Sequence, residues 1–460
     1  MTKAASAIPK ASLRLAGWGR LDPVSCPTSR PETYAALAGA VVEREPGTCI
    51  ARGLGRSYGD SAVNRGGAVV LTTRLDRILG FDADRGLVHA EAGVTFDDLL
   101  RVFLPRGWFP PVTPGTRHVT LGGAVAADVH GKNHHVDGAL SSWLEDVELV
   151  TADGQTVWCS AGHRPEVFWG TLGGMGLTGV VRSVRLRMTR VATSMMRVTY
   201  RRARNLEELL DAFGRAEDRR RYSVAWIDCV ARGERLGRSV LMDGEHAGVE
   251  DLPAERRAEP LASRERAKRS VPSFFPGFLL NRASVAAFNG LFYARHKDRT
   301  AVVDYDPYFY PLDAVRHWPR VYGKRGFIQY QALLPPASSR AGMRALLEAI
   351  SEAGLASFLA VLKRMGAASP APLGFPAPGD TLALDLPHRG DRLRRLVERL
   401  DAIVLEHGGR LYLAKDAMMS RATFERMYPR VGEFRELRRQ LDPGGRFASD
   451  QARRLGLVEA

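Results

Sequence analysis

A glycine-rich segment, ARGLGRSYGD at residues 51–60, lies between two short apolar runs, and this order restricts the fold more than any other feature of the sequence. Its glycines follow the pattern Gly53-x-Gly55-x-x-x-Gly59, which is close to a dinucleotide-binding fingerprint. A Rossmann fold requires a helix directly after such a loop. Here the chain passes through turn residues into a second predicted strand, residues 67–73. The sequence therefore argues against a Rossmann fold and favours an anion-binding loop made of successive backbone N–H groups.

Two further loops in the same β-rich region, residues 112–135 and 170–181, are also rich in small residues. Small residues allow a flat ligand to lie against the backbone. Arg52 and Arg56 of the first loop can add positive charge beside a phosphate. Together the three loops predict a large, extended ligand that bears phosphate, whereas the first loop alone is also compatible with an ordinary glycine-rich turn.

The region before residue 192 is rich in predicted strands. Residues 80–93 predict a hairpin, and residues 95–107 predict an amphipathic helix. Thr95 is the expected N-cap, with Asp98 three residues later, and Gly107 marks the end of the helix. Further strands are predicted at residues 47–53, 67–73, 144–160 and 179–191.

After residue 192 the predicted helices become longer. The apolar spacing predicts an α+β protein of two domains, with a boundary near residue 192. The predicted helices are residues 206–219, 340–354 and 392–409, the β-type runs are 222–230 and 326–334, and a proline-rich connector covers 369–380.

The sequence is strongly basic, with 66 Lys and Arg residues against 51 Asp and Glu residues. Such an excess is compatible with nucleic acid, an anionic membrane surface or phosphorylated ligands, but the basic residues are spread along the chain. The densest run, residues 262–280, mixes basic with apolar and aromatic residues. We expect this run to be a surface loop or a membrane contact. Because no signal peptide and no run of about 18 apolar residues is found, the chain is expected to be soluble or peripherally attached.

Neither the cysteines nor the histidines have the spacing of a metal site. The cysteines lack CxxC spacing and predict reduced thiols; they are Cys26, Cys49, Cys159 and Cys229. The cluster HGKNHH, residues 130–135, lacks an HExxH or carboxylate pattern, so no metal is expected there. His130 directly follows the run of small residues and is therefore expected to lie beside the ligand of that loop.

The glycine-rich segments RGLGRSYGD, PGTRHVTLGGAVAADVHGKNHH and FWGTLGGMGLTG resemble the flavin-binding domain of the vanillyl-alcohol-oxidase superfamily. Within this superfamily the chain resembles the decaprenylphosphoryl-β-D-ribose 2′-oxidase family. Similar segments follow in order to the end of the chain: AGWGR, YSVAWID, GFIQYQ, GGRLYLAKDA, MYPRV and FASDQARRL.

The resemblance implies a particular α+β fold, in which a PCMH-type FAD-binding domain carries an inserted substrate domain with an antiparallel sheet and helices. We expect residues 1–192 to form the FAD-binding domain and residues 193–409 the substrate domain. Residues 410–460 are expected to return to the FAD-binding domain.

The resemblance also implies which residues line FAD. Many members of the superfamily attach the flavin covalently through a histidine in the first loop, where this chain has Tyr58. We therefore expect noncovalent FAD. The implied cofactor residues are Arg52, Gly53, Leu54, Gly55, Arg56, Ser57, Tyr58, Gly59, Asp60, Gly115, Thr120, Leu121, Gly122, Gly123, Ala127, Asp128, Val129, His130, Val181 and Tyr412.

The activity that the resemblance implies is oxidation of the 2′-hydroxyl of decaprenylphosphoryl-β-D-ribose to a ketone. A companion NAD-dependent keto-reductase would then form the arabinose epimer, the donor for cell-wall arabinan. The expected catalytic residues are His130, Lys415 and Tyr58, with His130 the leading candidate for the base because its ordinary pKa is near neutrality. Lys415 is expected to anchor substrate and to stabilise negative charge on the reduced flavin.

The implied substrate residues include one departure from the family. Gln329 and Gln331 alternate on one face of a predicted strand, which suits hydrogen bonds to sugar hydroxyls. Where the Mycobacterium-type enzyme has asparagine and cysteine, this chain has Thr381 and Ala383. That cysteine is the attachment point of the benzothiazinones, so we expect sugar oxidation without irreversible inhibition. The remaining candidates are Lys132, Trp226, Lys363 and Lys415.

Two kinds of alternative remain open from the sequence. One is another sugar, alditol or aldonolactone oxidase of the same superfamily. The other is a non-catalytic protein that binds lipid or nucleic acid, although no nucleic-acid-binding module is recognisable. The expected location is cytoplasmic or peripherally membrane-associated, while the resemblance also allows the cell-envelope side.

Overall fold

The strand, loop and strand predicted around residues 51–60 are present in the structure, a computed structural model that describes residues 11–43, 47–214, 220–263, 269–272, 276–277, 280–355 and 359–459. Strand β3 (Cys49–Arg52) leads into the loop, β4 (Ala68–Leu71) follows it, and the two pair in parallel. Residues 53–67, all of which the structure describes, contain no helix. The arrangement differs from a Rossmann fold at the point that the sequence indicated.

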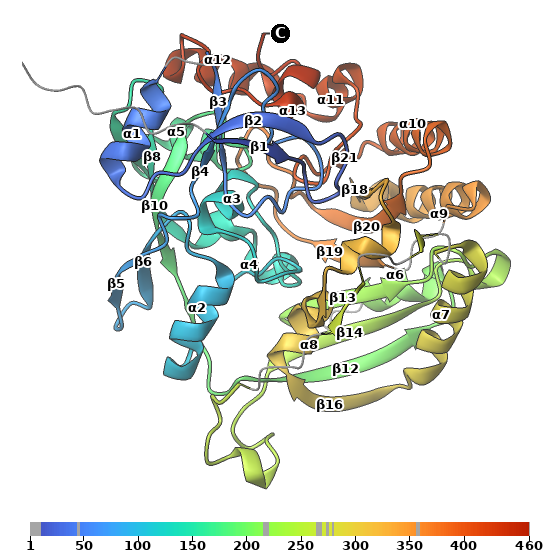
Figure 1. Cartoon of the computed structure of the whole chain (residues 1–460). Helices are drawn as coiled ribbons and strands as arrows, with labels where there is room; N and C mark the ends of the chain where they lie inside the picture. Colours follow the sequence, from blue (N-terminus) through green and yellow to red (C-terminus); the bar gives the residue numbers. More distant parts are fainter. Residues whose placement is uncertain are drawn as a thin grey trace, which may run out of the picture.

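Two sheets form the N-terminal lobe, which is blue to green in Figure 1. The first has the order β1-β2-β4-β3, and the second is antiparallel with the order β5-β6-β10-β8-β9. The hairpin predicted at residues 80–93 and the strand structure predicted at residues 144–160 are therefore confirmed. The additional strands are β1 (Ala11–Leu15), β2 (Val24–Ser29), β5 (Ile78–Asp82), β6 (Leu87–Glu91), β8 (Leu144–Val150), β9 (Thr156–Cys159) and β10 (Val180–Arg187).

The capped helix that follows β6 is α2 (Phe96–Phe103). The Thr95 hydroxyl accepts a hydrogen bond from the Asp98 N–H, and the Asp98 carboxylate accepts one from the Thr95 N–H. A single 3₁₀ turn extends the helix to Gly107, which has a φ of 78°. The predicted cap and stop are both confirmed.

The second glycine-rich segment is not a continuous loop, because it contains the short helices α3 (Leu121–Ala126) and α4 (His134–Asp137). Two glycines within α3 disfavour a helix by intrinsic propensity. Packing overrides that preference, since a Cβ on Gly122 would lie only 2.9 Å from the Ala92 Cβ. Only glycine lets α3 approach the strand-end backbone this closely.

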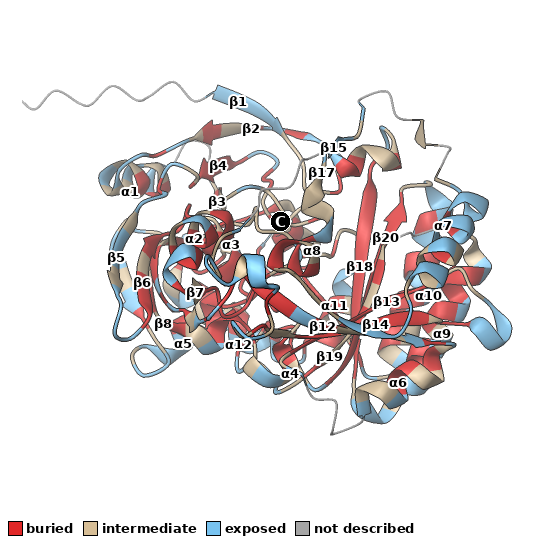
Figure 2. Ribbon diagram, turned by 90° about the horizontal axis from the view of Figure 1, so that it is seen from below, coloured by how far each residue is buried: buried red, intermediate tan, exposed pale blue. Residues whose placement is uncertain are grey.

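The second lobe is built on an antiparallel sheet of eight strands with the order β16-β12-β14-β13-β19-β20-β18-β21. Side chains alternate between its two faces. One face packs against helices α6, α9 and α10, which lie beside the buried strands in Figure 2. The strands are β12 (Met195–Ala203), β13 (Tyr222–Ile227), β14 (Ser239–His246), β16 (Arg299–Asp304), β18 (Phe327–Leu334), β19 (Ala360–Met365), β20 (Gly379–Pro387) and β21 (Arg410–Leu411).

Three helices cover this face. The segment α6 (Leu206–Gly214) is shorter than predicted within the described residues, and the rest of the predicted helix, residues 215–219, lies outside them. The predicted helix at 340–354 begins earlier, so that α9 is Pro336–Ala353, because proline is well suited to the first helical turn. The third helix is α10 (Asp391–Glu406).

The last part of the chain packs back onto the N-terminal lobe, as the red helices over the blue strands show in Figure 1. Phe447 forms a bridge with Cys49, and the Arg446 guanidinium donates to two backbone carbonyls, Ala40 and Val41, of α1 (Tyr34–Val42). Strand β21 pairs with β18, so the returning chain first completes the edge of the large sheet. The helices of this part are α11 (Arg421–Met427), α12 (Val431–Leu441) and α13 (Asp450–Arg454).

Shorter elements connect these parts. The strand pairs β7–β11 and β15–β17 are two residues long, and α7 lies outside every helix that the sequence predicted. The remaining elements are α1 (Tyr34–Val42), β7 (Trp108–Phe109), α5 (Pro165–Thr171), β11 (Thr189–Arg190), β15 (Arg269–Ser270), α7 (Arg282–Arg295), α8 (Tyr305–Phe309) and β17 (Val315–Arg316). No helix in the described ranges is long and apolar enough to cross a membrane.

Candidate functional site

A cavity of about 1080 Å³ lies between the glycine-rich loops and the sheet face opposite the covering helices. This volume lies at the upper end of the range for small-molecule pockets, about 300–1000 Å³, as a large ligand requires. The predicted residues that line it are Arg52, Gly53, Leu54, Gly55, Arg56, Ser57, Tyr58, Gly115, Thr120, Gly122, Gly123, Ala127, Val129, His130, Lys132, Val181, Trp226, Gln329, Gln331, Lys363, Ala383, Tyr412 and Lys415.

Five predicted site residues lie outside the lining and instead hold the residues that form it. The Asp60 carboxylate pairs with Arg454, and the Asp128 carboxylate accepts hydrogen bonds from Ser141 and Ser369. Leu121 is buried within α3. The other two are Gly59 and Thr381, whose contacts are described below.

The first loop is held between the two ends of the chain. The Trp18 N–H donates to the Ser57 carbonyl at 2.7 Å, and the Tyr58 N–H donates to the Ala414 carbonyl at 3.1 Å. A Cβ on Gly59 would lie 2.0 Å from the Asp416 carbonyl oxygen, so a side chain has no room there. The shape of the loop therefore depends on both the N-terminal and the C-terminal segments.

The two loop arginines bind protein groups as well as facing the cavity. The Arg52 guanidinium donates to the carbonyls of Ala16 and Ala62 at 2.7 and 2.9 Å. Arg56 Nε donates to the His118 carbonyl at 2.9 Å, and its guanidinium stacks 4.0 Å from the Trp18 ring centroid. Both guanidinium groups thus stabilise the loop and add positive potential to it. Their hydrogen bonds to protein carbonyls hold them in place.

His130 is a buried imidazole with a defined partner at each nitrogen. Its Nε2 is 3.0 Å from Gln331 Nε2, and its Nδ1 is 3.2 Å from Lys363 Nζ. Burial, and next the nearby Lys363, hold the pKa of His130 well below its ordinary value of 6.5. The imidazole is therefore neutral at physiological pH.

Three lysines face the same cavity, and none forms an ion pair with a carboxylate among the described residues. Burial, followed by repulsion from neighbouring lysines, lowers the pKa of Lys132 and of Lys363 to about 7. Burial lowers the pKa of Lys415 to about 8, with Asp385 opposing the shift. Lys132 Nζ donates to the Tyr308 carbonyl, and Lys415 Nζ lies 4.2 Å from the Tyr58 ring centroid.

Tyr58, which was expected to be catalytic, is a buried ring beneath Lys415. Its ring packs edge-on against Phe327, with centroids 5.5 Å apart. Burial raises the pKa of Tyr58 well above its ordinary value, so the phenol stays protonated. A cation above an aromatic ring in a desolvated site is a favourable arrangement.

Sequence reasoning missed Asp385, which carries one of the Gln329 contacts. Asp385 Oδ1 accepts from Gln329 Nε2 at 2.7 Å, and Oδ2 accepts from the Tyr322 hydroxyl at 3.2 Å. Burial raises the pKa of Asp385 to about 7. The alternation of β20 offered a signal, because Asp385 lies on the same face as Ala383.

Sequence reasoning also missed the apolar end of the cavity. There Trp226 contacts Phe292 of α7 with ring centroids 4.5 Å apart, and Phe288 of the same helix is 48% exposed. The cavity thus runs from polar groups at His130 to an aromatic end that reaches the surface. The other lining residues of this end are Tyr200, Val224, Met242 and His296.

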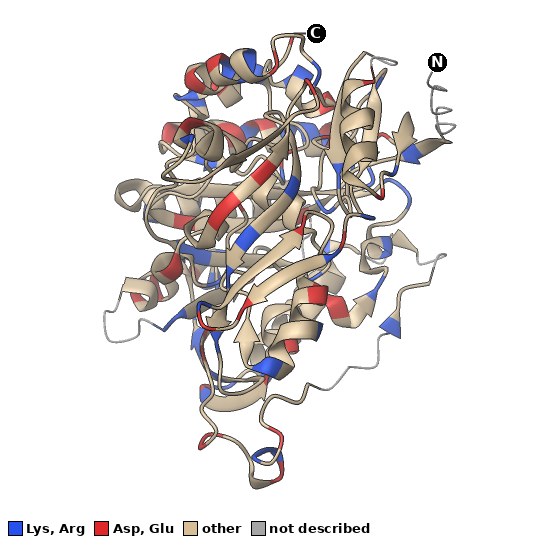
Figure 3. Cartoon of the chain, turned by 90° about the vertical axis from the view of Figure 1, so that its left-hand side faces the viewer, with Lys and Arg blue, Asp and Glu red and all other residues tan. Residues whose placement is uncertain are grey.

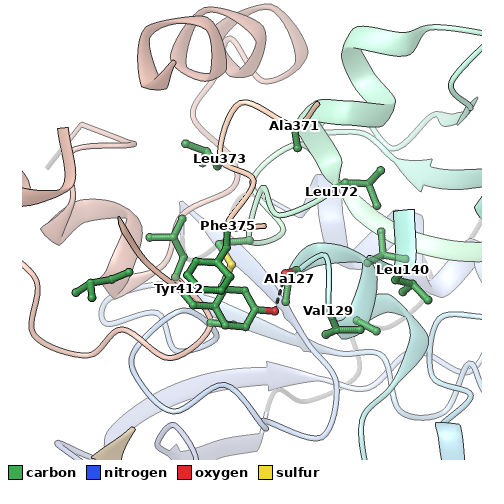
Figure 4. Close-up of a cluster of buried hydrophobic side chains, with 14 of the residues drawn as sticks. Ala127, Val129, Leu140, Leu172, Ala371, Leu373, Phe375 and Tyr412 are labelled. Atoms are coloured by element: carbon green, nitrogen blue, oxygen red, sulfur yellow. Dashed lines mark hydrogen bonds between the residues drawn. The ribbon is translucent and has the colours of Figure 1, made fainter. Parts of the chain in front are cut away.

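Tyr412 joins the returning chain to the second glycine-rich segment, as Figure 4 shows. Its hydroxyl donates to the Ala127 carbonyl at 2.7 Å, and its ring stacks on Phe375 with centroids 4.7 Å apart. The His130 ring lies 5.4 Å from the Tyr412 ring. Tyr412 therefore supports the cavity wall beside His130.

Histidine, cysteine and carboxylate side chains do not gather into a metal site within the described ranges. These ranges contain no group of three His, Cys, Asp or Glu side chains that could hold a metal ion. The four cysteines are free and buried. On the side that Figure 3 shows, basic and acidic residues are interspersed over the same elements.

Two known protein families match segments of the chain that line this cavity. Residues 22–160, which carry the first two loops, match the FAD binding domain family. Residues 334–455, which carry Lys363 and Lys415, match the D-arabinono-1,4-lactone oxidase family.

Individual proteins are similar over very different lengths. The chain is 38% identical to the decaprenylphosphoryl-beta-D-ribose oxidase of Mycolicibacterium smegmatis over 457 residues, which cover 98% of this chain and 99% of that protein. It is 36% identical over 373 residues to an uncharacterised protein of Streptomyces coelicolor, covering 79% of this chain and all of the other. It is 32% identical over 160 residues to the alditol oxidase of a Streptomyces species, covering 34% of this chain and 37% of that protein.

Proposed function

Because this chain belongs to the decaprenylphosphoryl-β-D-ribose oxidase family, we propose that it oxidises the 2′-hydroxyl of decaprenylphosphoryl-β-D-ribose to a ketone. The chain is an FAD-dependent oxidoreductase. The observation that carries the substrate assignment is similarity that extends over both lobes, and hence over both walls of the cavity.

The residues present fit FAD. Three small-residue segments approach one cavity, and at Gly53 a Cβ would lie 2.1 Å from the Thr120 hydroxyl oxygen, so the wall is shaped by the absence of a side chain. When bound there, FAD supplies the two-electron acceptor of the reaction. The lining residues of the three segments, together with Val181 and Tyr412, would hold it. Tyr58 cannot form a histidyl link, so we propose noncovalent binding.

The substrate would occupy the remainder of the cavity. Gln329 and Gln331 offer amide groups to the sugar hydroxyls, and His130 lies beside Gln331 as the first acceptor of the hydroxyl proton. Holding the reacting carbon about 3–3.5 Å from the electron acceptor supplies much of the rate. The aromatic end at Trp226 and Phe292 suits the start of a polyprenyl chain, because it buries apolar surface.

The position of Thr381 and Ala383 bears on inhibition rather than on turnover. Ala383 lines the cavity, whereas Thr381 lies behind Gln331. A methyl group has no sulfur for a covalent bond, so we propose that sugar oxidation persists while nitroaromatic inhibitors of the benzothiazinone type bind only reversibly.

Two partners follow from the proposed reaction. A keto sugar is an intermediate, so an NAD-dependent keto-reductase is proposed as the companion enzyme. The lipid tail implies contact with a membrane, and residues 262–280 were the expected contact; much of this run lies outside the described residues.

The experiment that tests the proposed function is anaerobic mixing of the purified flavoprotein with candidate substrates while the flavin absorbance is recorded. Decaprenylphosphoryl ribose is expected to bleach the flavin. Free ribose, an alditol and an aldonolactone are expected to leave it oxidised. Bleaching by an alditol or an aldonolactone alone would favour the other oxidases of the superfamily.

A further inference from the structure

We infer that Lys363 receives the proton of the substrate hydroxyl, with His130 passing it from one ring nitrogen to the other. This inference rests on the proposed function and adds to it the place where the proton resides. It is carried by a chain of hydrogen bonds that links Thr381, Gln331, His130 and Lys363.

The direction of this chain is fixed at Thr381. The Thr381 hydroxyl donates its single hydrogen to the Ala332 carbonyl at 2.9 Å, so its oxygen can only accept from Gln331, 3.3 Å away. The atom of Gln331 that faces Thr381 is therefore the amide nitrogen. The second hydrogen of the same nitrogen is directed at His130 Nε2, 3.0 Å away.

It follows that Lys363 is an uncharged amine in this arrangement. Because His130 Nε2 accepts a hydrogen bond, the hydrogen of the neutral imidazole is on Nδ1. Nδ1 then donates to Lys363 Nζ at 3.2 Å, which requires a lone pair on that nitrogen. An ammonium group has none, whereas a neutral amine has one.

The surroundings explain why the proton would not remain on His130. The imidazole is buried, and the charge of Lys415 opposes a positive charge on it. Lys363 is also buried, but an amine is intrinsically the stronger base by about four pKa units. The ionisable groups around Lys363 are His130, Lys132 and His134 from one segment and Lys415 from the returning chain.

The proposed step transfers two protons at the same time. The substrate hydroxyl replaces the Gln331 amide at His130 Nε2, and its O–H bond breaks as the proton moves to Nε2. The Nδ1–H bond breaks at the same time, and that proton forms the third N–H bond of the Lys363 ammonium group. The imidazole ends neutral in its other tautomer. The carbon–hydrogen bond would break as the carbonyl forms, and FAD, when bound, would supply the acceptor for the hydrogen and its two electrons.

The first experiment measures flavin bleaching by decaprenylphosphoryl ribose in K363A and K363R. Each variant is used only if it retains the flavin absorbance of the wild type. We expect the rate at saturating substrate to fall by about 10²–10⁴-fold, as for loss of a general base. Ethylamine is expected to restore it in proportion to the uncharged fraction of the amine. K363R keeps a cation but offers no lone pair, and we expect it to stay slow.

The pH profile gives a readout that a purely structural role would not change. Burial lowers the pKa of Lys363 to about 7, so the wild-type rate is expected to rise with pH through that value and then level off. K363A should lose this rise, and K363A with ethylamine should show it at a much more alkaline pH. K324Q removes an exposed lysine outside the cavity and is expected to keep the wild-type profile.

The second experiment needs no turnover. Brief acetylation of the wild-type holoenzyme with acetic anhydride, followed by mass spectrometry of the peptide, reports the uncharged fraction of Lys363. We expect the acetylation of Lys363 in the folded protein to level off above about pH 7. Acetylation of the same lysine in the denatured chain is expected to keep rising with pH.

Three results would overturn the inference. They are a K363A rate within about threefold of the wild type, a K363R variant that restores the rate, and labelling of Lys363 that rises in parallel with that of the denatured chain. If the wild type itself fails to bleach with decaprenylphosphoryl ribose, the proposed function is overturned and this inference with it.

Discussion

Lys415 shows how single residues from distant parts of the chain share one environment. Its ammonium group lies over the Tyr58 ring, and Asp385 opposes the loss of its charge in a buried site. A positive charge held there is well placed to stabilise negative charge that develops beside it. Lys415 would therefore stabilise the negative charge of the reduced flavin.

We predict that K415M lowers the flavin reduction rate by about 10²-fold or more and shifts the flavin reduction potential to a more negative value. The loss of a nearby positive charge makes the reduced, anionic form less stable. Dye equilibration of the flavin-bound variant measures the potential. An unchanged potential at full flavin occupancy would contradict this role.

Ala383 allows a test of a covalent contact. We predict that the wild type forms no covalent adduct with a benzothiazinone during turnover, whereas A383C does, because the new sulfur would face the cavity. Mass spectrometry of the intact protein measures the adduct. A414C, which places a cysteine elsewhere in the same cavity, serves as the matched control. A mass-shifted wild type would show the prediction to be wrong.

Among the elements, those specified by nearby residues could be predicted, and those specified by packing could not. Helix α2 was found because its cap and stop lie within the segment itself. Helix α3 was missed because its glycines favour a loop unless Ala92 is known to lie against them. Likewise the alternation of β18 predicted the two glutamines, but the partner Asp385 depends on the register of β18 against β20.

At the level of helix α2, T95A is predicted to lower the free energy of unfolding by about 0.5–2 kcal/mol, because the Asp98 N–H loses its capping acceptor. T95S retains the hydroxyl and is expected to keep most of the stability. Denaturant unfolding followed by circular dichroism measures both. Equal losses in the two variants would exclude the cap as the cause.

Between elements, Y412F is predicted to cost about 1–3 kcal/mol, because the buried Ala127 carbonyl loses its donor. The same change should weaken FAD retention, since Ala127 lies in the cavity wall. Unfolding curves and flavin release on dilution measure the two effects. If Y412F retained FAD as well as the wild type does, the hydrogen bond between Tyr412 and Ala127 would have no role in cofactor binding.

For the whole molecule, the buried lysines link stability to pH. The folded state lowers the pKa of Lys363 to about 7 from 10.5, so between these values the unfolded state binds more protons. The free energy of unfolding therefore gains up to about 1.4 kcal/mol per pH unit from this group as the pH rises.

We predict that K363M is more stable than the wild type at pH 7 and that this advantage shrinks toward pH 10. Unfolding of flavin-free protein at several pH values measures the difference without ligand linkage. The buried, non-ionisable substitution I350V is the control, and its cost should not vary with pH. A pH-independent difference for K363M would show that Lys363 is fully charged in the folded protein.

The proposed reaction breaks the carbon–hydrogen bond at position 2 of a lipid-linked ribose. The most direct measurement is the rate of anaerobic flavin bleaching with decaprenylphosphoryl ribose, compared with the same substrate carrying deuterium at carbon 2. We expect complete bleaching, a 2′-keto product and slower bleaching with the deuterated substrate. Bleaching that is absent, or that yields no ketone, would contradict the proposed reaction.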